Sequence, residues 1–300
     1  MQAPQQGRYC GRFAPSPTGP LHIGSLLAAV ASFLDARAAG GRWLLRIEDI
    51  DPPREVPGAS DAIIASLQRH GLSWDGDILW QSSRIDAYRD ALATLRQRGL
   101  IFDCSCTRAT LGPGGSCAGR CSPGPGDACA QRLRIVEALK DFDDRFLGPQ
   151  RCQDMDDLPT SDITLWRKDG LPAYQLAVCV DDSWQGVNAV VRGSDLLSQS
   201  PVQAYLLTAL GCPVPSYAHL PLILGEDGRK LSKQNGARAI NDERPLANLR
   251  QVLALLGQES AEAEAATPEQ LLACATERWT PALLPTGAAP LVYADASNPP

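Results

Sequence analysis

The sequence predicts an α/β fold with a parallel sheet, on three observations taken in chain order. Residues 9–14 form a short apolar run that we predict to be a strand. Residues 26–39 are rich in Ala and Leu and contain no internal Gly or Pro, which predicts a helix. Gly40-Gly41 ends that helix, and residues 43–47 are predicted to be the next strand. A right-handed crossover of this kind places the loop before the helix at the carboxyl ends of parallel strands, where α/β sheets bind ligands.

That loop, residues 14–22, is rich in proline and glycine and is the first candidate for a nucleotide site. Unpaired N–H groups at a helix N-terminus favour an anion such as a phosphate. His22 adds an imidazole donor, and Gly24 lets the backbone approach a nucleotide closely. On these few residues alone, a Pro-rich turn with a histidine satisfied in the core is an equally good interpretation.

Composition is that of a soluble globular enzyme. The chain has 300 residues, 44% hydrophobic and 21% charged, enough for one large or two modest domains. No run approaches the length of a membrane span, and the first residues lack a signal-peptide layout, so we expect a cytoplasmic protein. The net charge of −6 argues against indiscriminate polyanion binding but allows a local basic face.

The strand at 43–47 is followed by acids, in the string Arg46-Ile47-Glu48-Asp49-Ile50-Asp51. Acids at the carboxyl end of such a strand face the ligand crevice. They could accept hydrogen bonds from an ammonium group; a solvated turn is the alternative.

The remaining elements follow from periodicity, glycine stops and capping residues. We predict strands at 162–167, 187–191 and 219–224, and helices at 60–70 with Ser60 as N-cap, 82–98, 201–211 with Pro201 at the first helical position, 245–256, and from Pro268 with Thr267 as N-cap. The apolar run 171–181 is either a buried strand or a short helix. Residues 281–300 have no periodicity and are predicted to be a loose tail.

Four of the ten cysteines form two close pairs separated by a glycine-rich stretch: Cys104, Cys106, Cys117 and Cys121. Two such pairs can wrap a tetrahedral Zn²⁺, and free thiols are the alternative. Lysine is also concentrated, because two of only four lysines, Lys230 and Lys233, lie in one short string after a Gly-flanked turn. Such lysines could swing onto a triphosphate and neutralise its charge, although a lone string of this kind is usually a surface charge run.

The stretch FAPSPTGPLHIG, Phe13 to Gly24, resembles the HIGH signature of class I aminoacyl-tRNA synthetases in the form of the glutamyl/glutaminyl branch. Ser25 stands where the signature has its second histidine. The string Lys230-Leu231-Ser232-Lys233-Gln234 resembles the KMSKS loop. The resemblance implies a class I nucleotide-binding fold, with His22 and Lys233 as catalytic residues and ATP contacts at His22, Gly24, Ser25, Lys230 and Lys233.

The resemblance also implies a glutamate pocket. The family's RIED element corresponds to residues 46–49, its Y-Q-L-A segment begins at Tyr174, and its R-G-x-D-L segment begins at Arg192. A guanidinium makes paired hydrogen bonds to a planar carboxylate, so two arginines would select glutamate over glutamine by charge. Core packing is the alternative for Tyr174. The implied glutamate contacts are Arg12, Phe13, Ala14, Pro15, Ser16, Glu48, Tyr174 and Arg192.

Within this branch the chain resembles the glutamyl-Q tRNA(Asp) synthetases, short paralogues of glutamyl-tRNA synthetase. These have C-x-C followed by Y-x-G-x-C, and Cys117 replaces the tyrosine, which would give four thiolates around one structural zinc. About sixty residues follow the lysine loop, too few for an anticodon-binding domain of typical size. The resemblance implies five segments: residues 8–100 and 171–240 as the halves of the catalytic domain, 101–170 as an inserted zinc-bearing α+β subdomain, 241–280 as a short helical region, and 281–300 as the tail.

The implied reaction is ATP- and Mg²⁺-dependent activation of L-glutamate to glutamyl-adenylate. The glutamate then passes to queuosine in the anticodon loop of tRNA(Asp), and we expect a monomer with no membrane partner. Two alternatives remain open on the sequence. One is a truncated glutamyl-tRNA synthetase that charges a tRNA 3′ end, and the other is a non-catalytic nucleotide- or RNA-binding paralogue.

Overall fold

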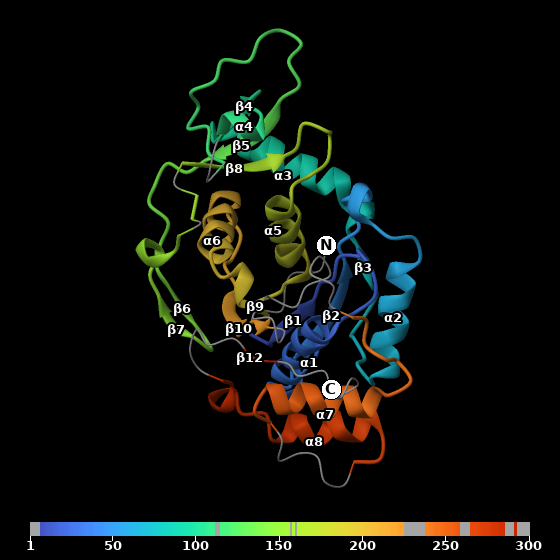
Figure 1. The fold of residues 1–300 in the computed structure, drawn as a ribbon. Coiled ribbons are helices and arrows are strands. Elements are labelled where there is room, and N and C mark those ends of the chain that lie inside the picture. Colours follow the sequence, from blue (N-terminus) through green and yellow to red (C-terminus); the bar gives the residue numbers. More distant parts are fainter. Residues whose placement is uncertain are drawn as a thin grey trace.

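The structure is a computed structural model that describes residues 7–111, 115–156, 158–159, 161–224, 238–258, 265–285 and 291–292. Parallel strands form its centre (Figure 1). One parallel sheet has the order β1 (Cys10–Phe13), β2 (Arg42–Ile47) and β3 (Leu79–Trp80), and a second pairs β9 (Ala189–Gly193) with β10 (Ser216–Leu220). The predicted α/β fold with a parallel sheet is confirmed.

The two sheets adjoin between β1 and β9. The backbone N–H of Asn188 donates to Cys10 O at 3.0 Å, and the N–H of Cys10 donates to the side-chain Oδ1 of Asn188 at 2.8 Å. Across both sheets the strands therefore run in the order β3, β2, β1, β9, β10. From the β1–β9 boundary, β2 and β3 are added on one side and β10 on the other, so this boundary is a topological switch point. Open α/β sheets bind ligands at the carboxyl ends of the strands at such a point.

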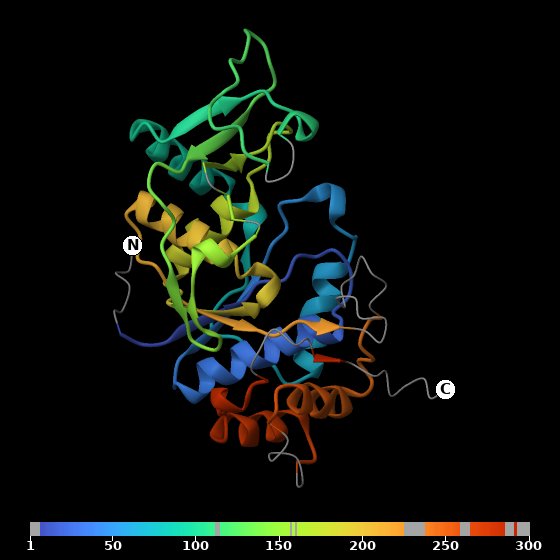
Figure 2. The same ribbon diagram turned by 60° about the vertical axis from the view of Figure 1, so that its left-hand side comes forward.

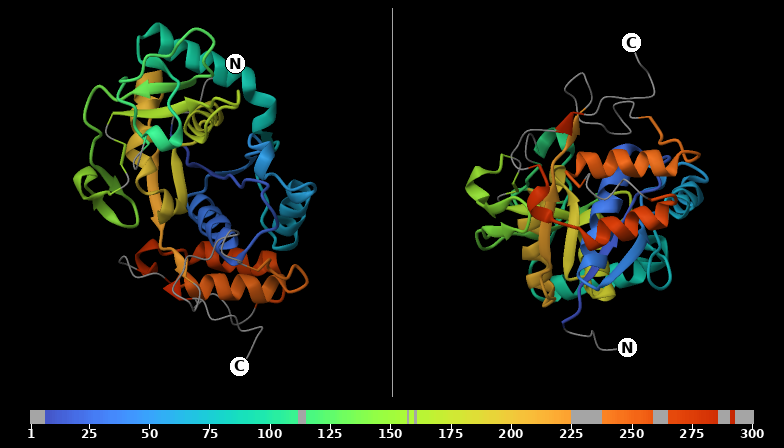
Figure 3. Two further views of the ribbon diagram at one scale, coloured as in Figure 1. Left: turned by 45° about the horizontal axis from the view of Figure 1, so that its top comes forward. Right: turned by 90° about the horizontal axis from the view of Figure 1, so that it is seen from below.

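Helices cover both faces of these strands. On one face α1 (Ile23–Ala38) packs against α7 (Pro245–Leu255) and α8 (Pro268–Glu277), and the view from below in Figure 3 has the three helices side by side. On the other face α3 (Ile85–Gln97), α5 (Tyr174–Gln185) and α6 (Gln199–Leu210) share a second apolar core. The helix α2 (Ala59–Arg69) adds Ile63 and Leu67 to the first core.

The segment between α3 and α5 is built from antiparallel strands. β4 (Ile101–Cys104), β5 (Ala130–Arg134) and β8 (Asp162–Trp166) form one sheet beside the short α4 (Arg108–Leu111). The hairpin of β6 (Phe142–Asp144) and β7 (Gly148–Gln150) returns to the parallel strands, where Arg145 N donates to Tyr217 O at 2.8 Å. In Figure 2 this yellow-green hairpin extends down to β10. Part of the segment therefore contacts the parallel strands.

Short 3-10 helices complete the described elements, at Pro52–Arg54, Gln81–Arg84, Cys152–Asp154, Ser194–Leu196 and Pro281–Leu283. Thr267 caps α8 as predicted, because its side chain accepts from the N–H of Gln270. No helix within the described ranges is long and apolar enough to cross a membrane.

Several predicted boundaries are wrong. Ser60 is the second residue of α2, and Gly58, at φ +77°, is the N-cap. Pro201 is the third residue of α6, which begins at Gln199. Residues 174–181 of the run 171–181 belong to helix α5, which begins at Tyr174, so the helix alternative is the correct one. The strand expected at 219–224 is two strands, because Pro221 lacks the N–H needed to continue the pairing and separates β10 from β11 (Ile223–Leu224).

The tail also contains more order than expected. β12 (Leu291–Val292) pairs in parallel with β11, with Ile223 opposite Leu291. A two-residue strand has no periodicity of its own, and its partner lies far away in the sequence, so the prediction of a loose tail missed it.

Candidate active site

His22 starts helix α1 by capping it with its own side chain. Its Nδ1 accepts from the backbone N–H groups of Gly24 at 3.1 Å and Ser25 at 3.3 Å. The sequence predicts unpaired N–H groups here, and for Gly24 and Ser25 that prediction is wrong. A phosphate that used these two amides would have to displace the imidazole, whereas a phosphate that used the opposite ring nitrogen would not.

Ser25 holds the other side of the same ring. Its Oγ lies 3.1 Å from His22 Nε2. Because Nδ1 accepts two hydrogen bonds, the ring proton is assigned to Nε2, which donates to the serine oxygen. The residue that departs from the signature therefore orients His22.

The chain that follows the lysine string returns to His22. Ala239 forms an antiparallel bridge with His22, and Ile240 N donates to Leu21 O at 3.0 Å. Lys230 and Lys233 lie outside the described residues. The described segments on either side of them end at Leu224 and begin at Arg238.

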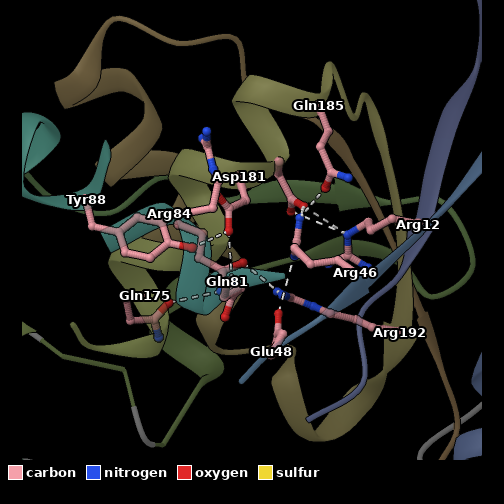
Figure 4. A network of polar contacts seen from close by, with 12 residues as sticks. Arg12, Arg46, Glu48, Gln81, Arg84, Tyr88, Gln175, Asp181, Gln185 and Arg192 are labelled. Atoms are coloured by element: carbon pink, nitrogen blue, oxygen red, sulfur yellow. Dashed lines mark hydrogen bonds and ion pairs between the residues drawn. The ribbon is translucent and has the colours of Figure 1, made fainter. Parts of the chain in front are cut away.

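Buried charged side chains gather at the other end of the site, and Figure 4 labels Arg12, Arg46 and Glu48 among them. Asp182 on α5 accepts from Arg12 Nε at 3.2 Å and from Arg46 Nη1 at 2.7 Å. Burial alone would raise the pKa of Asp182, but the two guanidinium charges outweigh it and hold the pKa below its usual value. Within the described part of the chain no hydrogen bond engages Nη1 or Nη2 of Arg12, so its terminal N–H groups are available to a ligand.

Glu48 lies directly after β2 and is 8% exposed. Its carboxylate is 3.6 Å from Arg46 Nη2, and its backbone N–H donates to Pro15 O at 3.0 Å, which brings the loop of residues 13–16 beside it. Burial raises the pKa of Glu48 to about 7, opposed by the charges of Arg46 and Arg12. A ligand ammonium would favour the ionised form, as the sequence analysis expected of an acid in this place.

The loop of residues 13–16 is fixed at both ends. The ring of Phe13 stacks on that of Trp43, with centroids 6.3 Å apart, and Ser16 O accepts from Thr18 N at 2.8 Å. Ala14 lies between Phe13 and Pro15, so the four predicted contacts are the last residue of β1 and the three residues after it.

Arg192 on β9 is almost fully engaged by neighbouring groups. Its Nε donates to His219 Nε2 at 3.1 Å and its Nη1 to Gln203 Oε1 at 2.8 Å, while its Nη2 donates to Ser200 Oγ at 2.7 Å and Leu196 O at 3.2 Å. Four of its five N–H groups are therefore used. In this arrangement Arg192 by itself does not offer a carboxylate the paired hydrogen bonds expected of it, whereas Arg12 has the donors to do so.

Tyr174 begins α5 and lies at the boundary between core and site. Its side chain packs against the second apolar core. Burial raises the pKa of the Tyr174 hydroxyl, which also experiences the charges of Arg192, Glu48 and Arg12. The structure thus brings together four side chains that the sequence analysis grouped.

The four clustered cysteines converge as well. Their sulfur atoms all lie within 4.8 Å of one another, with Cys106 and Cys117 3.8 Å apart and Cys117 and Cys121 3.3 Å apart. Thiolates at about 2.3 Å from a tetrahedral zinc ion would be separated by about 3.8 Å, so the donor set fits this metal. Asp162 braces the second pair by accepting from Ala118 N at 2.6 Å.

Comparison with known proteins agrees with this geometry. The family model described as tRNA synthetases class I (E and Q), catalytic domain, matches residues 10–113 and 124–272. Glutamyl-Q tRNA(Asp) synthetase of Escherichia coli (strain K12) is 48% identical over 285 residues, which cover 94% of this chain and 92% of that protein. The chain belongs to the glutamyl-Q tRNA(Asp) synthetase family.

Other members of the glutamyl-Q tRNA(Asp) synthetase family agree. The protein of that name from Klebsiella pneumoniae (strain 342) is 48% identical over 92% of this chain and 94% of its own length. The one from Pseudomonas putida (strain W619) is 46% identical over 91% and 94% respectively.

Solved structures support the fold. Glutamate-tRNA synthetase from Elizabethkingia anophelis superposes with a TM-score of 0.78 at 23% identity, over 96% of this chain and 68% of that one. Mycobacterium tuberculosis methionyl-tRNA synthetase in complex with methionyl-adenylate superposes with a TM-score of 0.58 at 13% identity, over 83% of this chain and 63% of that one. The class I synthetase fold implied by the resemblance is therefore confirmed.

In this member of the glutamyl-Q tRNA(Asp) synthetase family, sequence reasoning did not assign the residues that support the site. Asp181 accepts from Gln81 Nε2 at 2.9 Å, Arg84 Nε at 3.0 Å and Tyr88 OH at 2.6 Å. Asp182, Arg46 and His219 were likewise left without a role. The available signal was charge within apolar stretches, since such charges are buried only when they are paired.

Proposed function

We propose that this protein activates L-glutamate with ATP and Mg²⁺ and transfers it to queuosine in the anticodon loop of tRNA(Asp). The observation that carries the proposal is the meeting of Arg12, Glu48, Tyr174 and Arg192 at the β1–β9 switch point, with His22 at the start of α1. Relatives that are 46–48% identical over nearly their whole length carry a name that states this amino acid and this tRNA.

In the first step an oxygen of the α-carboxylate of glutamate attacks the α-phosphorus of ATP. The bond from that phosphorus to the bridging oxygen breaks, and pyrophosphate leaves with the electron pair. Glu48 would accept from the substrate ammonium, and the free N–H groups of Arg12 would bind the γ-carboxylate with help from Arg192. Glutamine has no charge at that position, so the buried arginines favour glutamate.

At the phosphates, His22 and Lys233 would stabilise the charge that develops as the bond breaks. The pairing of Ala239 with His22 supports this role for Lys233. Lys233 stands six positions before Ala239, so its Cα can lie at most about 20 Å from that of Ala239.

In the second step a hydroxyl of the cyclopentene-diol of queuosine attacks the acyl carbon of the adenylate. The bond from the acyl carbon to the phosphate oxygen breaks, AMP leaves with the electron pair, and the hydroxyl loses its proton as the ester forms. A base splayed from a single-stranded anticodon loop can enter such a pocket, as is usual when proteins recognise RNA in loops.

Glutamate-dependent ATP–pyrophosphate exchange, with and without tRNA, tests the proposal. Exchange without tRNA, followed by labelling of queuosine-containing tRNA(Asp) and not of tRNA lacking queuosine, is the expected result. Exchange only when tRNA(Glu) is present, with label on its 3′ end, would favour a truncated glutamyl-tRNA synthetase instead. Absence of exchange under all conditions would favour a non-catalytic paralogue.

The role of Lys233 is tested by Lys233→Ala. Loss of one charge on the transferring phosphates predicts a fall in the exchange rate of about 100-fold or more. The matched control is Lys140→Ala, since Lys140 is an exposed lysine of the inserted segment. Equal rates for the two variants would refute the assignment.

We also propose that the four-cysteine cluster holds one structural Zn²⁺. Four protein thiolates leave no position for a reactive water, so the metal would stabilise the fold and take no part in chemistry. Protein loaded with Co²⁺ should have intense thiolate-to-metal absorption that Cys121→Ser weakens and Cys152→Ser does not. Absence of this absorption, together with zinc-free purified protein, would contradict the site.

The division into five segments, with the inserted segment 101–170 contacting the acceptor, and a monomeric state complete the proposal. Limited proteolysis should cut first at the boundaries near residues 100, 170, 240 and 280. Sedimentation should give a mass near the 32.1 kDa of one chain.

A further inference from the structure

Behind Arg192 lies a buried chain of hydrogen bonds that begins in the inserted segment. Asp144, the last residue of β6, accepts from His219 Nδ1 at 2.5 Å, and His219 Nε2 accepts from Arg192 Nε at 3.1 Å. His219 is 0% exposed, Asp144 3% and Arg192 5%. Three elements far apart in the sequence thus meet in one line of polar groups.

The two oxygens of Asp144 have separate partners. Oδ1 accepts from the backbone N–H groups of Phe146 at 3.0 Å, Leu147 at 2.9 Å and His219 at 3.1 Å. These amides fix the carboxylate plane and leave Oδ2 for the imidazole. An ionised carboxylate only accepts, so the proton of His219 is on Nδ1 and the lone pair of Nε2 faces the guanidinium.

We propose that Asp144 is a positioning residue for glutamate recognition, because it sets the tautomer of His219 that in turn orients Arg192. The inference rests on the proposed function, in which Arg192 contacts the substrate. The other tautomer would direct an N–H of His219 at the Nε–H of Arg192, and an imidazolium would add a second positive charge. Either change would turn away the one N–H of Arg192 that remains for the substrate.

The surroundings keep His219 neutral. Burial lowers its pKa, and so does the charge of Arg192, against the opposing effect of Asp144 and Asp195. Ser200 Oγ lies 3.2 Å from Nε2, and the rings of Phe142 and Tyr217 pack beside the imidazole. The Asp144 carboxylate itself has a lowered pKa: burial opposes this, but the hydrogen bond from His219 and those from backbone amides outweigh it.

Asp144→Asn is the decisive variant. The three backbone amides require an acceptor at the Oδ1 position, so the asparagine must place its carbonyl oxygen there and its NH₂ toward His219 Nδ1. That NH₂ can only donate, which moves the ring proton to Nε2. The matched control is Asp143→Asn, since Asp143 is the exposed neighbour on the same strand.

The first readout is the tautomer itself. The chain has only three histidines, so ¹⁵N-histidine NMR resolves each ring. We expect an Nδ1–H ring for His219 in the wild type and in Asp143→Asn, and an Nε2–H ring in Asp144→Asn. An Nε2–H ring in the wild type, or an unchanged ring in folded Asp144→Asn, would overturn the proposal.

The second readout is kinetic. In pyrophosphate exchange we expect Asp144→Asn to raise the KM for glutamate about tenfold with little change in the KM for ATP, since about one hydrogen bond is lost. His219→Gln keeps an acceptor for Arg192, so adding Asp144→Asn to it should cost little more. Full additivity of the two changes would contradict an action of Asp144 through His219.

The two readouts separate this inference from the proposed function. A wild type that fails to exchange with glutamate would refute the proposed function, while the NMR experiment would still report on the hydrogen-bond chain. Normal exchange by the wild type with equal glutamate KM in Asp144→Asn would refute the positioning role alone.

Discussion

The proposed amino-acid end and the proposed nucleotide end of this site are held by different kinds of contact. At the amino-acid end, buried arginines are fixed by buried partners: Arg46 by Asp182 and Gln185, and Arg192 by a ring of four acceptors. At the nucleotide end, His22 bonds to the first turn of its own helix and to Ser25. Recognition of a substrate by charge needs groups of fixed orientation away from water, whereas phosphates can be bound by long side chains that adjust their position.

The largest expected effect follows from breaking the amino-acid end. Arg46→Met leaves Asp182 and Glu48 without the guanidinium that lies between them. Removing one partner from a buried charged network costs about 3–5 kcal/mol, which urea denaturation would measure. The control is Arg54→Met, which removes an arginine that is 67% exposed and should cost less than about 1 kcal/mol. Equal losses of unfolding free energy in the two variants would show that the buried network stabilises the fold no more than a surface ion pair does.

The pH dependence of stability tests whether burying Glu48 at the proposed amino-acid end lowers the free energy of unfolding. The pKa of Glu48 is raised from 4.5 to about 7, so the folded chain retains a proton that the unfolded chain has released between these values. Stability therefore falls as the pH rises through this window, by up to about 3 kcal/mol.

Glu48→Gln should remove that fall. We expect the variant to resist urea better than the wild type at pH 8 and about equally at pH 4.5, while its kcat/KM for glutamate drops. For the wild type, the KM for glutamate should rise as the pH is lowered through about 7, since only the ionised carboxylate attracts the ammonium. Glu137→Gln, a change at an exposed acid, serves as the control. A stability difference that does not vary with pH would contradict the reasoning.

The smallest expected effect is at the nucleotide end. Ser25→Ala removes one hydrogen bond to His22, worth about 1 kcal/mol, and should raise the KM for ATP about fivefold with no change for glutamate. Ser83→Ala, at an exposed serine that bonds to Trp80 O, is the control. If the rise in the KM for ATP corresponded to more free energy than the stability lost in Arg46→Met, the comparison between the two ends would be reversed.

Contacts between neighbouring residues could be predicted from the sequence, whereas contacts between residues far apart in the chain could not. The strand, loop and helix around His22 follow from neighbouring residues, and so do the cysteine pairs and the cap at Thr267. The bonds from Arg12 to Asp182 and from His219 to Asp144 span 170 and 75 positions, so no local pattern reveals them. Burial, which sets the pKa of Glu48, is also a property of the folded chain.

Where prediction failed locally, a competing contact decided the outcome. Gly58 adopts a left-handed conformation and starts α2 before Ser60 can cap it. The 3-10 helix that ends at Leu196 leads almost directly into α6, so that helix begins ahead of Pro201.

The bridge between His22 and Ala239 has a consequence for how this protein can vary over time. It fixes Ala239 beside the start of α1, so the number of residues from Lys233 to Ala239 limits how far from His22 the proposed ATP contact Lys233 can lie. An insertion or deletion between Lys233 and Ala239 would change this limit on the position of Lys233. An insertion or deletion between Leu224 and Lys230 would leave the limit unchanged. Among natural homologues, gaps should therefore accumulate ahead of the lysines and be rare behind them.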